Sequence, residues 1–275
     1  MKRVLWFAPT LFGLIFCLGP LTACQTPDTL LPKVTVTAAS PPLRIGLSDC
    51  ASEFGHLVDR DLPQNVSLAE IQLIQGNDRT LLEDLKEGFL DAALVYHVPD
   101  KEEHWFNPVA LDGLVFIVHP DNSTLDIGLA EASALFAGSV LDWSTIGGPE
   151  LEVKLISREP GAGARIILEE RLMAELPIAG SSMIASSGES LRSNVLMEPG
   201  AIGYSMMGNS KDMKALTVEG ITAIPANTTD QSYPLTAPLY FVSSGEPDGE
   251  LRGFLAWLQS PEGQAKIGEK YGQIR

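Results

Sequence analysis

Residues 71–97, IQLIQGNDRTLLEDLKEGFLDAALVYH, decide the fold class expected of this chain. IQLIQG (71–76) has the pattern of a short strand. DRTLLEDLKEGF (78–89) places apolar residues at helical spacing behind an aspartate suited to cap a helix. DAALVYH (91–97) is a second short strand pattern. Strand, helix and strand in this order predict a βαβ unit with a parallel sheet.

The same alternation extends in both directions along the chain. Upstream, LRIGL (43–47) predicts a buried strand and residues 52–62 predict a helix. Downstream, LDGLVFIVHPDN (111–122) predicts a long strand ending in a strong turn signal, after which a second unit of about domain size can begin. The later expected elements are a helix at 128–138, a strand at 153–158, a helix after residue 165, and further segments at 201–207 (strand), 233–244 (strand) and 249–272 (helix).

The composition limits the class of protein. The chain has 275 residues and 45% hydrophobic content, which suffices for a packed core and argues against disorder. Its 35 acidic and 19 basic residues give a formal net charge of -16. Because nucleic acid and anionic lipid surfaces repel such a chain, we expect neither as the main partner. Any anion site must therefore be local.

The N-terminus has the layout of an export signal. A basic pair precedes an apolar run over residues 4–18, which is shorter than the roughly 20 residues needed to span a bilayer. The run leads to LTAC (21–24), which resembles the bacterial lipobox. The resemblance implies a signal peptide in residues 1–24 and a lipid on Cys24 of the mature protein.

The segment after the signal, residues 25–42, is rich in Thr and Pro and predicts a flexible tether. Of the three cysteines, Cys17 leaves with the signal and Cys24 carries the lipid, so Cys50 alone remains. No intrachain disulfide can then form. We expect Cys50 to be a small buried residue.

SREPGAGAR (157–165) carries the strongest chemical signal. Its glycines stand where a strand turns into a helix, so free main-chain N–H groups and the positive end of the helix dipole converge there. Arg158 and Arg165 can add charged hydrogen bonds to an oxyanion. The alternative is an ordinary tight turn with two solvated arginines. The stretch lacks the Lys-Ser/Thr pair of a nucleotide-binding loop.

Several motifs, in their order and spacing from about residue 43 to the end, resemble the PstS-like family, the phosphate-binding subunit of bacterial phosphate importers. The motifs are ALDGLVFIVHPDN, LAEASALFAGSVLDWSTIGGPE, SREPGAGAR, PGAIGY, YPLTAPLYFV and SPEGQAKIGEKYG. The resemblance implies a type II periplasmic binding fold, in which two α/β lobes joined by crossing strands hold the ligand in a cleft. It places residues 43–117 and 233–275 in lobe I and residues 118–232 in lobe II.

The resemblance also implies partners and a location. The protein would present its ligand to a membrane permease and the ATPase subunit of an ABC importer. We expect a monomer outside the cytoplasm, held at the membrane through the lipid on Cys24.

The family's binding residues carry over only in part. Its phosphate-gripping arginine matches Arg158, and its Gly-Ser-Gly-Thr matches Gly161, Ala162, Gly163 and Ala164. The main-chain donors survive, but both hydroxyl groups are missing. Each could contribute roughly 1.5 to 3 kcal/mol against a charged ligand, so weaker phosphate binding is expected.

Two further family segments differ as well. The hydroxyl pair after the third strand is replaced by Val95-Tyr96, which leaves Tyr96 and His97 as candidate donors, although both residue types also serve as packing residues there. In the first segment, Ser48 and Ser52 keep hydroxyl groups near a helix start. Asp49 beside them would repel an anion unless it caps that helix, which is the role we expect.

No enzymatic or metal chemistry is indicated. The four histidines lack the spacing of a metal site, and no hydrolase motif or paired-carboxylate pattern is present. We therefore expect no cofactor, no metal and no catalysis. Trp143 could line the cleft, but the resemblance implies that it is a structural residue of the second lobe.

The leading hypothesis is a lipid-anchored binding protein that captures a small oxyanion, phosphate first, for an ABC importer. The missing hydroxyl groups leave molybdate, tungstate or an organic anion open as ligands. A surface sensor or interaction module that has lost transport is a second class, and an extracytoplasmic hydrolase on the same scaffold is a third.

Overall fold

The computed structural model describes residues 41–63, 70–99 and 104–274, which belong to one compact unit. The predicted export signal, the lipid site at Cys24 and all but the last two residues of the tether lie outside the described residues. The described strands are β1 (Leu43–Ser48), β2 (Ile71–Gly76), β3 (Ala92–Val95), β4 (Trp105–Val118), β5 (Asp126–Ile127), β6 (Lys154–Arg158), β7 (Met183–Ala185), β8 (Ala201–Met206), β9 (Lys214–Ala215), β10 (Thr217–Val218) and β11 (Thr236–Ser243).

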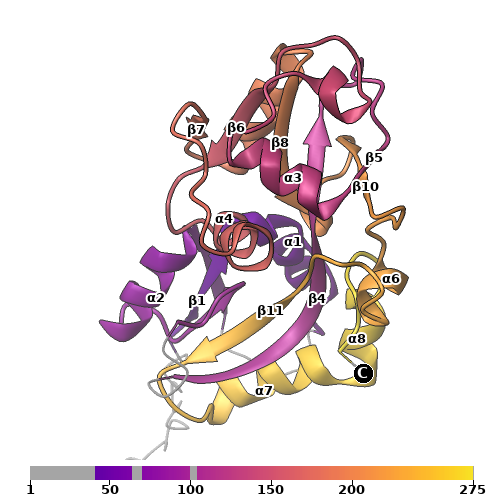
Figure 1. The fold of residues 1–275 in the computed structure, drawn as a ribbon. Helices are drawn as coiled ribbons and strands as arrows, with labels where there is room; N and C mark the ends of the chain where they lie inside the picture. Colours follow the sequence, from indigo (N-terminus) through magenta and orange to yellow (C-terminus); the bar gives the residue numbers. More distant parts are fainter. Residues whose placement is uncertain (1–40, 64–69, 100–103, 275) are drawn as a thin grey trace, which may run out of the picture. The chain divides into compact units, whose positions relative to one another are not determined.

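The helices alternate with the strands over the first part of the chain (Figure 1). The described α-helices are α1 (Ser52–Asp61), α2 (Asp78–Lys86), α3 (Leu129–Phe136), α4 (Gly163–Leu168), α5 (Gly188–Met197), α6 (Pro225–Thr229), α7 (Gly249–Gln259) and α8 (Pro261–Ile267). A 3-10 turn at Asp49–Ala51 precedes α1, and a π-helical segment at Glu169–Met173 continues α4.

The first three strands form the predicted parallel sheet. β1 lies in the centre and pairs in parallel with β2 on one side and β3 on the other. β11 then adds to β3 in the antiparallel sense, and β4 pairs antiparallel with β11. Because β1, β2 and β3 run in one direction, their carboxyl ends meet at one edge, which is where ligand sites form in such sheets.

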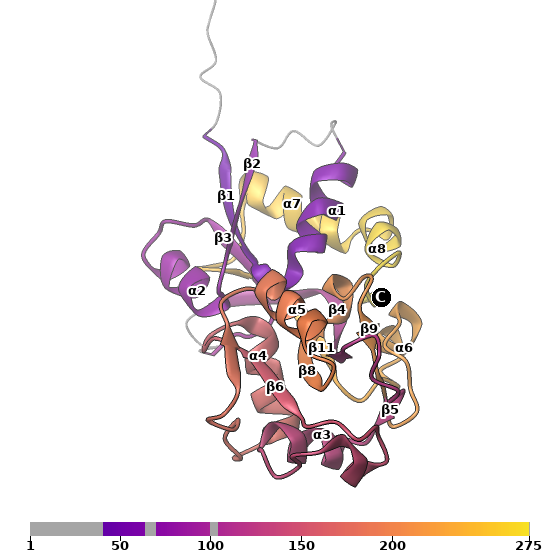
Figure 2. The ribbon, with the colours of Figure 1, turned by 90° about the horizontal axis from the view of Figure 1, so that it is seen from above.

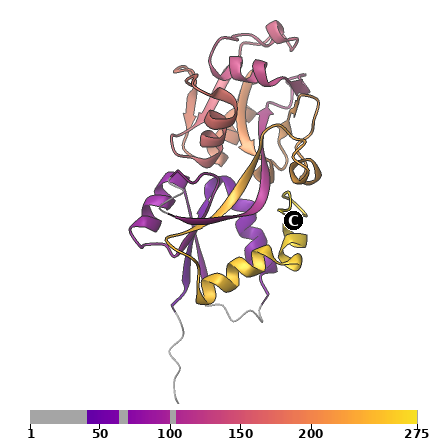
Figure 3. The same ribbon diagram turned by 60° about the horizontal axis from the view of Figure 1, so that its bottom comes forward.

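Helices cover both faces of this sheet (Figure 3). Ile45 and Leu47 of β1 pack with α1, α7 and α8 on one face. The three leucines of α2 pack with Ala93 and Val95 of β3 on the other. A strand with both faces covered needs apolar residues throughout, which is why LRIGL and AALV are near-continuous apolar runs.

β4 joins the two lobes. Residues 105–113 of β4 pair with β11, and residues 114–118 pair with β8, so the strand changes partner between Gly113 and Leu114. Beyond this point the sheet continues in the order β8, β6, β7, with β6 parallel to both neighbours. We call the part with β1, β2, β3, β11, α1, α2, α7 and α8 the first lobe, and the part with β6, β7, β8, α3, α4 and α5 the second lobe. The lobe limits at residues 117 and 232 stay a prediction.

The second lobe packs its helices on β8 and β6, and α5 contacts both strands (Figure 2). Trp143 is fully buried, and its indole N–H donates to the carbonyl of Gly200 at 2.9 Å. Trp143 is therefore structural, as expected.

The structure differs from the sequence expectations in several places. The long strand begins at Trp105 rather than at residue 111. The helical tail is broken at Ser260, because Pro261 starts a new helix that Ser260 caps. α2 is capped by the Asn77 side chain, which accepts from the N–H of Arg79, so the expected aspartate cap was wrong. The elements that were not predicted are α5, α6, β5, β7, β9 and β10.

Candidate functional site

The carboxyl ends of the parallel strands in the first lobe face the start of α4 in the second lobe. The groups that meet there are the side chains of Ser48, Cys50, Asp78 and Arg158 and the main-chain N–H groups of Tyr96, Gly163 and Ala164, and we call this set the α4 corner.

A buried carboxylate, that of Asp78, occupies the centre of the α4 corner. The Ser48 hydroxyl donates to its Oδ1 at 2.5 Å, and the main-chain N–H of Tyr96 donates to its Oδ2 at 2.8 Å. The N–H of Gly163 at the start of α4 also donates to it. Burial raises the pKa of Asp78 to about 7, although these three hydrogen bonds favour the charged form.

Arg158, at the end of β6, is also part of the α4 corner and is only 2% exposed. Its Nη2 pairs with Asp49 Oδ2 at 2.5 Å, and its Nε and Nη2 donate to the two carboxylate oxygens of Glu159 at 2.9 Å each. Burial alone would lower the pKa of Arg158, but the Glu159 hydrogen bond and the charge of Asp49 raise it above its usual value. Arg158 is therefore a fixed, buried cation, not a solvated one.

The Cys50 thiol fills the space between Arg158 and α4. Its Sγ lies 3.4 Å from Nη1 of Arg158 and 3.4 Å from the main-chain nitrogen of Ala164. Burial raises the pKa of this thiol, so it is a neutral, weak acceptor for both donors. The expectation that Cys50 is a small buried residue is confirmed.

The glycines of the turn allow the close approach of Asp78. Gly161 has a φ of +93°, a conformation that favours glycine. A Cβ on Gly163 would lie 2.6 Å from Oδ2 of Asp78, closer than non-bonded atoms can approach. The GAG sequence thus makes room for a carboxylate against the main chain of α4.

The α4 corner contains part of the predicted ligand-binding set. Arg158, Gly163 and Ala164 meet there with Ser48, which is also the cap of the 3-10 turn because it accepts from the N–H of Cys50. Asp49 pairs with Arg158 and caps no helix, so the capping role expected for it was wrong. Ala162 and Ala164 are buried and offer no side-chain donor.

The other predicted residues point elsewhere. The Tyr96 hydroxyl donates to the buried carboxylate of Asp112 at 2.7 Å, so only the main chain of Tyr96 faces the corner. Nδ1 of His97 lies 2.8 Å from Oε1 of Glu170. Arg165 donates to the carbonyl of Arg158 and to Glu169, each at 2.8 Å.

Ser52 and Gly161 have local partners. The Ser52 hydroxyl accepts from the side-chain amide of Asn209 at 3.0 Å, and the carbonyl of Gly161 accepts from the N–H of Arg79 at 3.3 Å. Neither residue donates into the α4 corner through these contacts.

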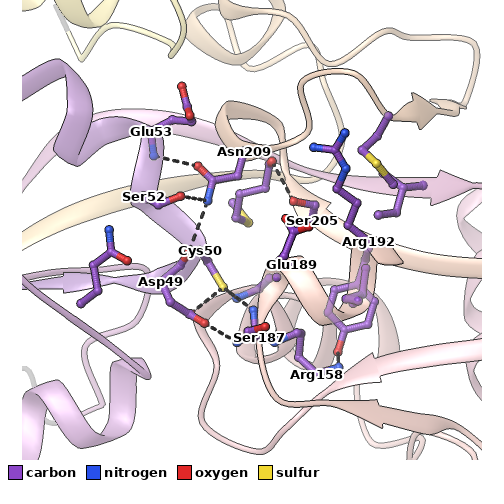
Figure 4. A pocket seen from close by; sticks show the side chains of 18 residues that line it. Asp49, Cys50, Ser52, Glu53, Arg158, Ser187, Glu189, Arg192, Ser205 and Asn209 are labelled. Carbon is purple, nitrogen blue, oxygen red and sulfur yellow. Dashed lines mark hydrogen bonds and ion pairs between the residues drawn. The ribbon is translucent and has the colours of Figure 1, made fainter. Parts of the chain in front are cut away.

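A cavity of about 320 Å³ opens next to the corner, between the two lobes. Figure 4 shows that its walls carry Asp49, Ser52 and Glu53 from the first lobe. The facing side carries Ser187, Glu189, Arg192 and Ser205 of the second lobe, and Arg158 and Cys50 lie where the cavity meets the corner. Arg158 is thus among the residues that line this cavity.

Asp78, at the centre of the α4 corner, is not among the predicted ligand-binding residues. It lies two positions after the end of β2, and Ser48 and Tyr96 stand at the ends of the two strands that complete the same parallel edge. Because carboxyl ends of parallel strands converge, this position could have been recognised as part of the site.

The described part of the chain offers no group of three or more His, Cys, Asp or Glu side chains that could hold a metal ion. Within the same residues, no helix has the length and apolar character required to cross a membrane.

Comparison with known proteins places the chain in a family. The family model described as "PBP superfamily domain" matches residues 33–262. The phosphate-binding protein PstS of Bacillus subtilis is 29% identical over 212 residues, which cover 76% of this chain and 66% of that protein. PstS of Borreliella burgdorferi is 20% identical over 174 residues, covering 58% of this chain and 62% of that protein. The matched regions thus span just under two thirds of these curated relatives.

Solved structures show the same fold. A putative phosphate ABC transporter substrate-binding protein from Clostridium perfringens, with bound phosphate, superposes with a TM-score of 0.78 at 22% identity, covering 86% of this chain and all of that one. An ABC-type phosphate transport receptor from Vibrio cholerae gives a TM-score of 0.67 at 21% identity, with 84% and 99% coverage. The predicted two-lobed α/β fold is confirmed by these similarities.

Proposed function

This chain belongs to the PBP superfamily, and on that premise we propose that it captures inorganic phosphate outside the cytoplasm and presents it to an ABC importer. The PstS-like resemblance seen in the sequence is confirmed by relatives that are named as phosphate-binding proteins. Those names describe binding proteins. We assign no catalysis to this chain.

One observation carries the proposal. The guanidinium of Arg158 is 2% exposed, yet it lies where the cavity between the lobes meets the start of α4. A buried cation flanked by main-chain N–H groups can bind an oxyanion strongly, because charge-assisted hydrogen bonds gain strength away from water. Closure of the lobes over the ligand would exclude water further.

The hydrogen-bond donors of the α4 corner are not free to receive phosphate. The N–H groups of Gly163 and Tyr96 already donate to Asp78, and the guanidinium of Arg158 already pairs with Asp49 and Glu159. Capture therefore requires an exchange, in which phosphate oxygens replace internal acceptors. The missing hydroxyl groups at Ala162 and Ala164 weaken that exchange further.

The proposal also includes a location at the membrane and a transporter as partner. The lipid on Cys24 would hold the chain at the membrane, and the tether would let the lobes reach the permease. We propose that a single copy carries one anion to the permease and its ATPase subunit.

Calorimetric titration of the purified protein with phosphate tests the proposal, with sulfate and molybdate titrated in parallel. We expect phosphate to bind and to raise the melting temperature by mass action. Arg158→Lys is the matched variant, because it keeps the charge and loses the planar fork. Equal responses of the wild type and Arg158→Lys, or no response to phosphate between pH 5.5 and pH 8, would contradict the proposal.

A further inference from the structure

The carboxylate of Asp78 is a buried charge that the proposed transport function does not require. It is fully buried, and it accepts hydrogen bonds from three segments that are distant in sequence: the end of β1, the end of β3 and the start of α4. Asn77 caps α2, so Asp78 is not needed as the cap of its own helix. Its side chain instead faces Gly163 of the second lobe.

We propose that Asp78 is an internal competitor of the ligand, which holds the hydrogen-bond donors of the α4 corner until its carboxylate is neutralised or displaced by phosphate. The inference rests on the proposed function and names the residue that sets the affinity of that site. This residue lies outside the predicted ligand-binding set.

The geometry leaves no room for both acceptors. Gly163 is packed so closely against Asp78 that even a methyl group would collide with the carboxylate. The neighbouring alanines, Ala162 and Ala164, supply no further donors. An oxyanion that is to use the N–H of Gly163 must therefore take the position of the Asp78 carboxylate.

The charged and titratable groups around Asp78 favour its neutral form once an anion arrives. Asp49 faces it from the 3-10 turn, and its negative charge opposes ionisation of Asp78. Cys50 from the same turn is held neutral by burial. Arg158 from β6 is already paired with Asp49 and Glu159.

Tyr96 and Arg165 do not counteract the preference of Asp78 for its neutral form. Tyr96, at the end of β3, turns its phenol toward Asp112 and presents only its N–H to Asp78. Arg165, in the first turn of α4, is engaged with Glu169 and with the carbonyl of Arg158. An incoming anion would add to the negative charge of Asp49, so binding should be coupled to uptake of a proton by Asp78.

The expected fall in apparent phosphate affinity with rising pH follows from the fraction of protein molecules whose Asp78 is protonated. With the pKa of Asp78 at about 7, roughly ten of eleven molecules carry the ionised carboxylate at pH 8. If only the protonated form binds, the apparent affinity at pH 8 is about tenfold below its intrinsic value. At pH 6 most molecules are protonated, and the loss almost disappears.

Asp78→Asn tests the inference, because the amide keeps the size of the side chain and imitates its neutral form. The phosphate association constants of the variant and the wild type are measured by calorimetry on the full chain at pH 6 and pH 8. We take the ratio of the variant's constant to that of the wild type at each pH. The protonation state of phosphate affects both constants equally, so it does not change this ratio. We expect a ratio near one at pH 6 and about tenfold at pH 8.

Two further variants serve as controls for Asp78→Asn. Asp78→Ala removes the carboxylate altogether and should also bind phosphate more tightly than the wild type at pH 8. Asp59→Asn removes one negative charge from an exposed position on α1, and its ratio should stay near one at both pH values. Circular dichroism confirms that each variant is folded.

The outcomes separate the inference from the proposed function. If all proteins bind phosphate but the Asp78→Asn ratio is the same at both pH values, or is below one at pH 8, the inference is overturned and the proposed function stands. If no folded variant binds phosphate even at pH 6, both are overturned. If the Asp78 variants bind and the wild type never does, Asp78 is a competitor as proposed, but the wild type does not capture phosphate.

Discussion

Replacing Asp78 by asparagine should change the way in which stability depends on pH. Burial raises the pKa of Asp78 from 3.8 to about 7, so the folded protein binds a proton that the unfolded chain releases over this range. Such a group stabilises the fold fully below the unfolded pKa, and its contribution is lost as pH rises through the folded pKa. Asn cannot titrate, so this loss should be absent in the variant.

The loss of stability between pH 5 and pH 8 follows from the pKa values of two buried carboxyl groups, those of Asp78 and Asp112. Between pH 5 and pH 8 the contribution of Asp78 falls by about 3 kcal/mol, at about 1.4 kcal/mol per pKa unit. Burial also raises the pKa of Asp112 to about 6, which adds a loss of about 1 kcal/mol over the same interval. Carboxylates with lowered pKa, such as Glu53, gain their stability at lower pH, so they change little here. The wild type should therefore lose about 4 kcal/mol between pH 5 and pH 8, and the variant about 1 kcal/mol.

Urea unfolding followed by tryptophan fluorescence at both pH values measures this difference. Asp59→Asn again serves as the control for the loss of one negative charge, and it should follow the wild type. Parallel pH profiles for the wild type and Asp78→Asn would refute the reasoning, because they would show that the carboxyl group of Asp78 has the same pKa in the folded and unfolded states.

Three other variants or measurements probe the same corner. Arg158→Ala should lower the free energy of unfolding by about 2 kcal/mol, because it leaves two partly buried carboxylates without their cation; an unchanged urea midpoint would contradict this. Gly163→Ala should destabilise the fold by about 1 to 3 kcal/mol, and less when it is combined with Asp78→Ala, so additive effects in this double-mutant cycle would disprove the contact. Cys50 should react with a thiol reagent far more slowly in the native protein than in urea, as peptide mapping can show, and equal rates would mean that the thiol is exposed.

Much of the fold could be predicted from the sequence, because its central strands are short apolar runs separated by amphipathic helices. β2 coincides with the predicted IQLIQG segment, and β1 differs from its prediction by one residue. α5 was missed because its apolar residues do not form a clear helical stripe, and β7 has only three residues. The first part of β4, WFNPVA, contains a polar residue and a proline and gives no strand signal by itself.

The site could be predicted less well than the fold. Arg158 and the glycine turn were recognisable because local spacing alone brings a cation and free N–H groups together. The role of Asp78 depends on three hydrogen bonds from segments that are distant in sequence, so no local pattern reveals it and only the predicted order of the parallel strands could have pointed to its position. Tyr96 was a reasonable candidate donor, but pairing of its hydroxyl with Asp112 across the core turns the side chain away from the corner.

A crystal structure of the protein grown with phosphate below pH 6 tests the central claim most directly. The account predicts a phosphate ion whose oxygens accept from the main-chain nitrogens of Gly163 and Ala164 and from the guanidinium of Arg158, with the Asp78 side chain displaced from its present position. Phosphate bound elsewhere, with Asp78 still hydrogen-bonded to Ser48 and Tyr96, would contradict it.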